Sequence, residues 1–176
     1  MTADTSPKSR APQAQPQSTA PPPMFDMIEL FFFAYRDFVG DADRLLATLD
    51  FGRAHHRVIH FVSRQPGLTV AELLDILKIT KQSLNRVMKE LIDAAYVEVR
   101  AGVIDRRQRL LYPTGKGKKL AMDLALMQSQ RFTRALSHLE TDAHIYAIKF
   151  LTAMIDSDER SKVERLIWHD EKSKTP

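Results

Sequence analysis

The chain has no cysteine among its 176 residues, which excludes disulfide bonds, thiol nucleophiles and cysteine-based redox sensing. It has no Gly-x-Ser-x-Gly motif, and the segment Thr114-Gly-Lys-Gly-Lys118 lacks the four-residue spacer of a phosphate-binding loop. The most apolar run, Leu30-Phe-Phe-Phe-Ala-Tyr35, is far shorter than the roughly 20 residues that span a bilayer. These absences argue against an enzyme and against a membrane protein, and they favour a cytoplasmic location.

The two ends of the chain differ in composition from its middle. Residues 1–24 are rich in proline, alanine, serine, threonine and glutamine, which is typical of a disordered tail. This tail has no apolar h-region, so we do not expect a secretory signal. Residues 169–176 form a short polar tail. One domain is therefore expected over residues 25–168.

Two short amphipathic helices joined by a tight turn are expected between residues 69 and 94. Thr69 and Glu72 form a capping box before the first helix, which should stop near Lys78. Thr80 caps the second helix, whose apolar side chains recur on one face: Leu84, Val87, Met88, Leu91 and Ile92.

The opposite face of the second helix is polar and basic. Its side chains can donate to phosphates or hydrogen-bond base edges, and they crowd toward the helix N-terminus: Lys81, Gln82, Ser83, Asn85, Arg86 and Lys89. A rise of about 1.5 Å per residue makes the helix roughly 21 Å long, enough to lie across a major groove.

Two β-prone runs, residues 96–100 and 108–112, flank an arginine-rich loop and predict a β-hairpin. The loop tip would present Arg106 and Arg107, and arginine suits a narrow minor groove, where the negative potential is strongest. Asp105 is expected to pair with a neighbouring arginine and so fix the direction of its guanidinium.

The helix pair over residues 69–98 and the spacing Asp105-Arg-Arg107 … Thr114-x-x-Gly117 resemble the MarR family of dimeric winged helix-turn-helix regulators. By element order the resemblance extends from about Asp26 to about Ile167. It implies a mainly α fold with a small β-wing and with N- and C-terminal dimerisation helices. It also implies a homodimeric, sequence-specific transcriptional regulator that binds double-stranded DNA and responds to a small-molecule effector or to another signal or partner.

No cofactor is expected. The DNA-binding residues expected from the motif and the resemblance together are Thr69, Thr80, Lys81, Gln82, Ser83, Asn85, Arg86, Lys89, Asp105, Arg106, Arg107 and Arg109. An alternative keeps the same fold as a protein-interaction module without sequence-specific DNA binding. Salt separates the two, because a DNA-binding protein loses affinity steeply as salt rises.

Three positions depart from the family pattern. Lys78 and Ala95 stand where glycine is usual, and a non-glycine residue in a left-handed turn costs on the order of 1 kcal/mol. Pro113 replaces an apolar strand residue and cannot donate to a ladder, so the second strand of the wing should end there.

The positive charge is concentrated in one part of the chain. Between Lys81 and Lys119 there are ten lysines and arginines and four acidic residues, a local net charge of +6. The whole chain is +4, so the remainder sums to −2. This distribution is the footprint expected of phosphate neutralisation, although a run of charge can also be an ordinary solvated face.

Helical periodicity from Phe25 to Leu49 leaves more than one face apolar, because Phe33 lies off the main stripe. Such a helix is a candidate subunit interface, and an ordinary core helix is the alternative. Helix is expected again from Gly117 to about Leu139.

A further helix should start at Thr141 or Asp142 and continue through Ile155. Residues 156–160 break the pattern, and a last turn or two is expected from Ser161 to His169. Terminal helices packed across a two-fold axis would set two recognition helices about one DNA turn, ~34 Å, apart.

A helix is also expected from Phe51 to Arg64, and it carries His55, His56 and His60. His56 and His60 share a face, which is compatible with a metal site, but no matching carboxylate is found nearby, so structural or surface roles are favoured and no metal is expected. The resemblance places an effector pocket beside such helices. Its suggested lining is Phe32, Tyr35, His56 and His60, with core packing as the alternative for each.

Overall fold

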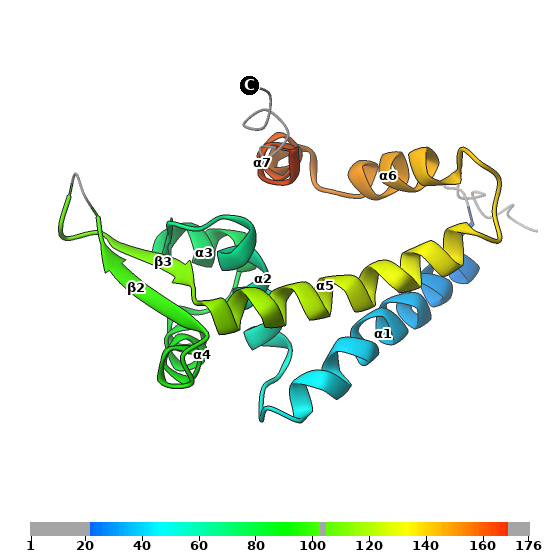
Figure 1. Cartoon of the computed structure of the whole chain (residues 1–176). Helices are drawn as coiled ribbons and strands as arrows, with labels where there is room; N and C mark the ends of the chain where they lie inside the picture. The colour runs from blue at the N-terminus through cyan, green and yellow to red at the C-terminus, as the bar shows by residue number, and fades with distance from the viewer. Residues whose placement is uncertain (1–21, 103–104, 169–176) are drawn as a thin grey trace, which may run out of the picture.

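The structure, a computed structural model, describes residues 22–102 and 105–168. Over these residues the chain is mainly helical, with one antiparallel sheet of order β1-β3-β2 (Figure 1). The elements are α1 Phe25–Ala47, α2 Arg53–Arg64, β1 Leu68–Thr69, α3 Val70–Leu77, α4 Lys81–Asp93, β2 Val97–Ala101, β3 Arg109–Pro113, α5 Gly115–Leu136, α6 Ala143–Ala153 and α7 Ser157–Trp168. The expected mainly α fold with a small β-wing is confirmed.

The expected tails, residues 1–24 and 169–176, lie outside the described residues except for residues 22–24. In the described part of the chain, no helix combines the length and the apolar character needed to cross a bilayer.

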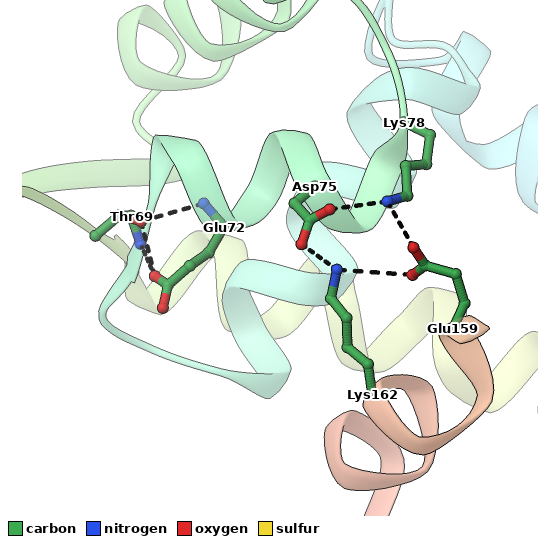
Figure 2. Close-up of polar contacts among 6 residues, drawn as sticks. All are labelled: Thr69, Glu72, Asp75, Lys78, Glu159 and Lys162. Carbon is green, nitrogen blue, oxygen red and sulfur yellow. Dashed lines mark hydrogen bonds and ion pairs between the residues drawn. The ribbon is translucent and has the colours of Figure 1, made fainter.

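Both helices of the helix-turn-helix begin at threonine caps, as expected. Thr69 Oγ1 accepts from the Glu72 N–H at 3.2 Å, and Glu72 Oε2 accepts from the Thr69 N–H at 2.8 Å (Figure 2). Thr80 Oγ1 accepts from the Ser83 N–H at 3.2 Å. Between the helices, Lys78 adopts a left-handed backbone with φ of 50°, so the turn forms without a glycine.

The core lies where α2 packs against α4, α5 and the sheet. Val58 and Val62 of α2 are fully buried there, and α4 contributes Leu84, Val87, Met88 and Leu91. Burying each such side chain stabilises the fold by about 1.5–3 kcal/mol, so the core keeps the apolar face of α4 inward and its polar face outward. Ile92, which we expected on the buried face, is 39% exposed.

The wing is an antiparallel hairpin. β2 and β3 pair in register from Val97 opposite Pro113 to Ala101 opposite Arg109, so β3 ends at Pro113 as expected. The short strand β1 pairs with the other edge of β3. The sequence did not predict β1, because two residues are too few to show the alternation typical of a strand.

The Thr114-x-x-Gly117 motif joins the wing to α5. Thr114 Oγ1 donates to the Ala95 carbonyl at 2.7 Å and accepts from the Gly117 N–H at 3.1 Å. A Cβ on Gly117 would overlap the Tyr96 carbonyl oxygen, so only glycine lets α5 approach the turn that follows α4. The motif therefore holds the start of α5 against the end of α4.

α1 and α5 pack side by side, whereas α6 and α7 form a C-terminal arm set apart from them (Figure 1). Within one chain α6 has no buried residue. The expected break between the two helices is present but lies at residues 154–156 rather than 156–160, because α7 begins at Ser157. Asp158 and Glu159 lie in its first turn, where acidic side chains stabilise a helix N-terminus.

Candidate nucleic-acid interface

The polar face of α4 is exposed to solvent. Four of its side chains have no hydrogen-bond or ion-pair partner within the described ranges: Lys81, Gln82, Asn85 and Arg86. The buried face of the same helix fixes the direction in which these side chains project. The exposed face therefore offers charged and amide donors of the kind that bind phosphates and purine edges.

Several of the other predicted contacts already form bonds within the chain. The hydroxyls of Thr69 and Thr80 cap α3 and α4, and the Thr80 hydroxyl also donates to Ser83 Oγ at 3.0 Å. Lys89 Nζ lies 2.6 Å from a carboxylate oxygen of Asp93, and this contact raises the pKa of Lys89. These groups are exposed or partly exposed, but they would share or exchange a partner when they contact DNA.

The arginines of the wing, Arg106, Arg107 and Arg109, are all exposed. The wing and α4 lie at the same end of the molecule, on the left of Figure 1. A basic loop and a basic helix at one end form a surface that can contact adjacent grooves of one duplex.

The structure corrects the expected role of Asp105. Its Oδ1 accepts from the backbone N–H of Arg107 at 2.9 Å, and its carbonyl accepts from the N–H of Gln108 at 3.0 Å. No ion pair between this carboxylate and an arginine is found among residues 22–102 and 105–168. A local bond between an aspartate and the N–H two residues on is favourable in turns, whereas an exposed ion pair contributes little. Asp105 therefore shapes the loop backbone.

One basic residue of the wing, Arg100, already has two partners within the chain. The Arg100 guanidinium lies 4.4 Å from the centre of the Tyr112 ring, and Arg100 Nε donates to Glu98 at 3.0 Å. Among the described residues of this surface, the basic side chains without a partner therefore belong mainly to the loop and α4.

His55, which the sequence grouped with two other histidines, lies between α2 and α4. Its Nε2 is 2.6 Å from Glu90 Oε2, and its Nδ1 accepts from the Gly52 N–H at 3.1 Å. The ring stacks on Phe51 at 4.6 Å between centroids. His55 is 8% exposed, so a buried side chain links α2 to α4. Sequence spacing gave no sign of this contact, because Glu90 is 35 residues away.

The other two histidines of α2 are partly buried. The centres of the His56 and His60 rings are 6.5 Å apart, and burial lowers the pKa of both imidazoles. The described residues contain no group of three or more histidine, aspartate or glutamate side chains placed to hold a metal.

The four suggested pocket residues are not brought together in one described cavity. His60 lines a cavity of about 140 Å³ between α2 and α7, whereas Phe32 packs edge-on against Phe33 at 5.3 Å. The Tyr35 hydroxyl accepts from Arg57 of α2 at 3.3 Å, which links α1 to α2. The pocket therefore stays a prediction.

Comparison with known proteins places this arrangement among regulators. A profile of the MarR family matches residues 49–108. The chain is 46% identical over 139 residues to the HTH-type transcriptional regulator PetP of Rhodobacter capsulatus, with 79% of this chain and 84% of the relative covered.

Solved structures share the fold. A MarR transcriptional regulator from Methanosarcina mazei has a TM-score of 0.63 and 22% identity, covering 75% of this chain and 88% of that one. A mutant of MarR from E. coli, solved in complex with operator DNA, has a TM-score of 0.58 and 19% identity, covering 77% of this chain and 100% of that one.

Proposed function

We propose that this chain, which belongs to the MarR family of winged helix-turn-helix transcriptional regulators, binds specific sites in double-stranded DNA as a homodimer. The exposed polar face of α4 beside the arginine wing carries the proposal. Its unpartnered donors and the local charge of +6 between residues 81 and 119 fit phosphate and base-edge contacts. A DNA-bound regulator of this kind would act in the cytoplasm.

The apolar surface of α1 and α6 supports the homodimer. A groove of about 630 Å³ runs between these helices, and its lining is almost wholly apolar: Met24, Met27, Ile28, Leu30, Phe31, Ala34, Phe150 and Met154. Exposed apolar surface on this scale is typical of an interface, and in a two-fold dimer the same surface of a second copy would pack against it. Two-fold pairing would place two copies of α4 about one DNA turn, ~34 Å, apart.

A small-molecule effector is the regulatory part of the proposal. We place it between the dimer helices and the winged domain, with Phe32, Tyr35, His56 and His60 as its lining. An effector that prefers one spacing of the recognition helices by about 1.4 kcal/mol changes DNA occupancy tenfold, so a small pocket is sufficient.

A mobility shift with fragments of the genome of origin, repeated across a salt series, tests DNA binding. A regulator that neutralises several phosphates should select a subset of fragments and lose affinity steeply as salt rises. Uniform binding to all fragments would contradict sequence specificity. An absence of binding at low salt would instead favour the protein-interaction module.

Two substitutions assign roles within the interface. Asn85→Ala should cost about 1–3 kcal/mol and relax the preference at particular base pairs, because its amide would contact base edges. Arg107→Ala should weaken binding to every site with a narrow flanking groove. Arg134→Ala removes an exposed charge from the last turn of α5 and is the matched control. If the first two behave like the control, the proposed docking is wrong.

A further inference from the structure

Four charged side chains join the C-terminal arm to the helix-turn-helix (Figure 2). Lys78 Nζ is 2.8 Å from Asp75 Oδ1 and 3.1 Å from Glu159 Oε1. Lys162 Nζ contacts Asp75 Oδ2 and lies 3.7 Å from Glu159 Oε2. The charges alternate around a closed ring, so every neighbouring pair is attractive. Asp75 belongs to α3 and Lys78 is the C-cap of that helix. Glu159 and Lys162 lie on consecutive turns of α7.

The position of Lys78 gives this ring its importance. Lys78 is the left-handed C-cap of α3, and the chain enters α4 only two residues later. Its side chain thus connects α7 to the turn that sets the angle between α3 and the recognition helix. The pKa of the Asp75 carboxyl is lowered to about 2 by hydrogen bonds from Lys162 and Lys78, so Asp75 is charged at neutral pH.

Two further contacts make α7 part of a continuous connection. Near the C-terminal end of α7, the C-cap residue of α2, Gln65, donates through Nε2 to the Leu166 carbonyl at 3.1 Å. At the other end, the Arg160 guanidinium donates to carbonyls at the end of α6, including Thr152 at 3.1 Å and Ile155 at 3.0 Å. Arg160 thereby fixes the angle between α6 and α7. A displacement of α6 would be transmitted to α7 and to the ring.

We propose that Glu159 and Lys162 are positioning residues for DNA binding, holding α4 at a defined angle to the C-terminal arm through Asp75 and Lys78. This inference rests on the proposed function, since α4 is taken as the recognition helix and α6 as part of the dimer interface. The four side chains are partly exposed, so the attraction is screened by salt and the expected effect is modest.

The test reverses the charges on α7 without changing composition or net charge. In the variant Glu159→Lys/Lys162→Glu, each new side chain meets a like charge across the ring. The matched control, Asp158→Arg/Arg165→Asp, makes the same kind of exchange on α7 at two exposed positions with no partner in the described ranges. Both variants remove one acid from the first turn of α7, and the control also replaces the basic side chain of the last turn, so the control should destabilise the helix at least as much as the ring variant does.

Two measurements are made on the full-length dimer. The first is affinity for an operator fragment at low salt. The second is the distance between the two copies of α4, obtained from spin labels on Gln82→Cys, since the chain has no native cysteine. We expect the ring variant to lose about fivefold in affinity and to show a broader distance distribution, within the usual range of coupling between sites. The control should change neither.

Restoring the alternation provides the rescue. Adding Asp75→Lys/Lys78→Asp to the ring variant makes every neighbouring pair attractive again, and both measurements should return toward those of the unaltered protein. The proposal is overturned if the ring variant matches the control, if the four-residue variant does not recover, or if light scattering shows that the ring variant is monomeric. Should the unaltered protein bind no DNA, the proposed function fails, and the distance distribution still decides the positioning role.

Discussion

The winged helix-turn-helix region and the terminal helices differ in how far they bury their large apolar side chains. Leu84 of α4 and Val58 of α2 are fully buried within one chain, whereas Phe31 of α1 and Phe150 of α6 are about half exposed. The recognition domain, α2 to β3, has a complete core, to which Ala42 and Leu46 of α1 and Leu120 and Leu124 of α5 also contribute. The exposed apolar side chains of α1 and α6 would be half of a second core, which the second copy in the proposed dimer would complete.

The stability of this protein therefore has two parts, the folding of one chain and the association of chains. Substitutions in the first core should act on the folding of one chain, whatever the protein concentration. Substitutions on the terminal helices should act on association, and their effect should depend on concentration.

Phe31→Ala should have the largest effect on association. Full burial of an aromatic side chain contributes about 1.5–3 kcal/mol, Phe31 is already half buried within one chain, and the substitution occurs twice in a dimer, so the dissociation constant should rise roughly 10- to 100-fold. Analytical ultracentrifugation across a concentration series would measure this. The circular dichroism spectrum of the variant should remain that of a helical protein. A variant that unfolds as a monomer would show that folding of one chain depends on association.

Leu84→Ala tests the other half of the comparison. It removes a fully buried side chain from the recognition helix and should lower the free energy of unfolding by about 2–5 kcal/mol. Urea denaturation at two protein concentrations would show the loss. Ile92→Ala on the same helix is the matched control, because Ile92 is substantially exposed and should cost much less.

Ala95→Gly should stabilise the recognition domain. Ala95 has a φ of 58°, and relief of this left-handed strain outweighs the greater flexibility of glycine in the unfolded chain by about 0.5–1 kcal/mol. A small rise in Tm by calorimetry would confirm the prediction. A fall would mean that the alanine methyl group makes packing contacts that matter more than the strain.

The smallest effect expected is a pH dependence from α2. Burial lowers the pKa of His56 and His60 below the ordinary 6.5, so the unfolded chain binds protons more readily than the folded one. Stability should therefore fall as the pH drops below about 6.5 through the lowered values. Urea denaturation from neutral to mildly acidic pH measures this, and His56→Gln/His60→Gln should flatten the slope. An unchanged slope would assign the dependence to other groups.

Local patterns predicted the recognition domain well. The caps at Thr69 and Thr80 and the apolar face of α4 are short-range features, and they appear in the structure at the expected residues. The end of β3 at Pro113 was also predicted, because proline cannot donate to a strand ladder. The position of the turn at Lys78 came from the resemblance, in which glycine is usual there, since lysine by itself does not favour a left-handed backbone.

Contacts between distant segments could not be predicted. The pair His55 and Glu90 joins two helices, and the ring of Asp75 and Lys162 spans 87 residues. Spacing along one helix carries no information about such partners. The partner of Asp105 was wrongly predicted for a different reason, since the backbone N–H of Arg107 competes with its guanidinium for the same carboxylate.

The absence of a side chain at Gly117 has a mechanical consequence. With its first turn seated on the end of α4, α5 behaves as a lever whose 22 residues extend about 33 Å. A rotation of α5 by about 5° around its far end would carry the recognition helix nearly 3 Å, close to the ~3.4 Å that separates neighbouring base pairs. In the proposed dimer, a small tilt near α1 would thus be enough to change the operator spacing that the two copies of α4 can contact together.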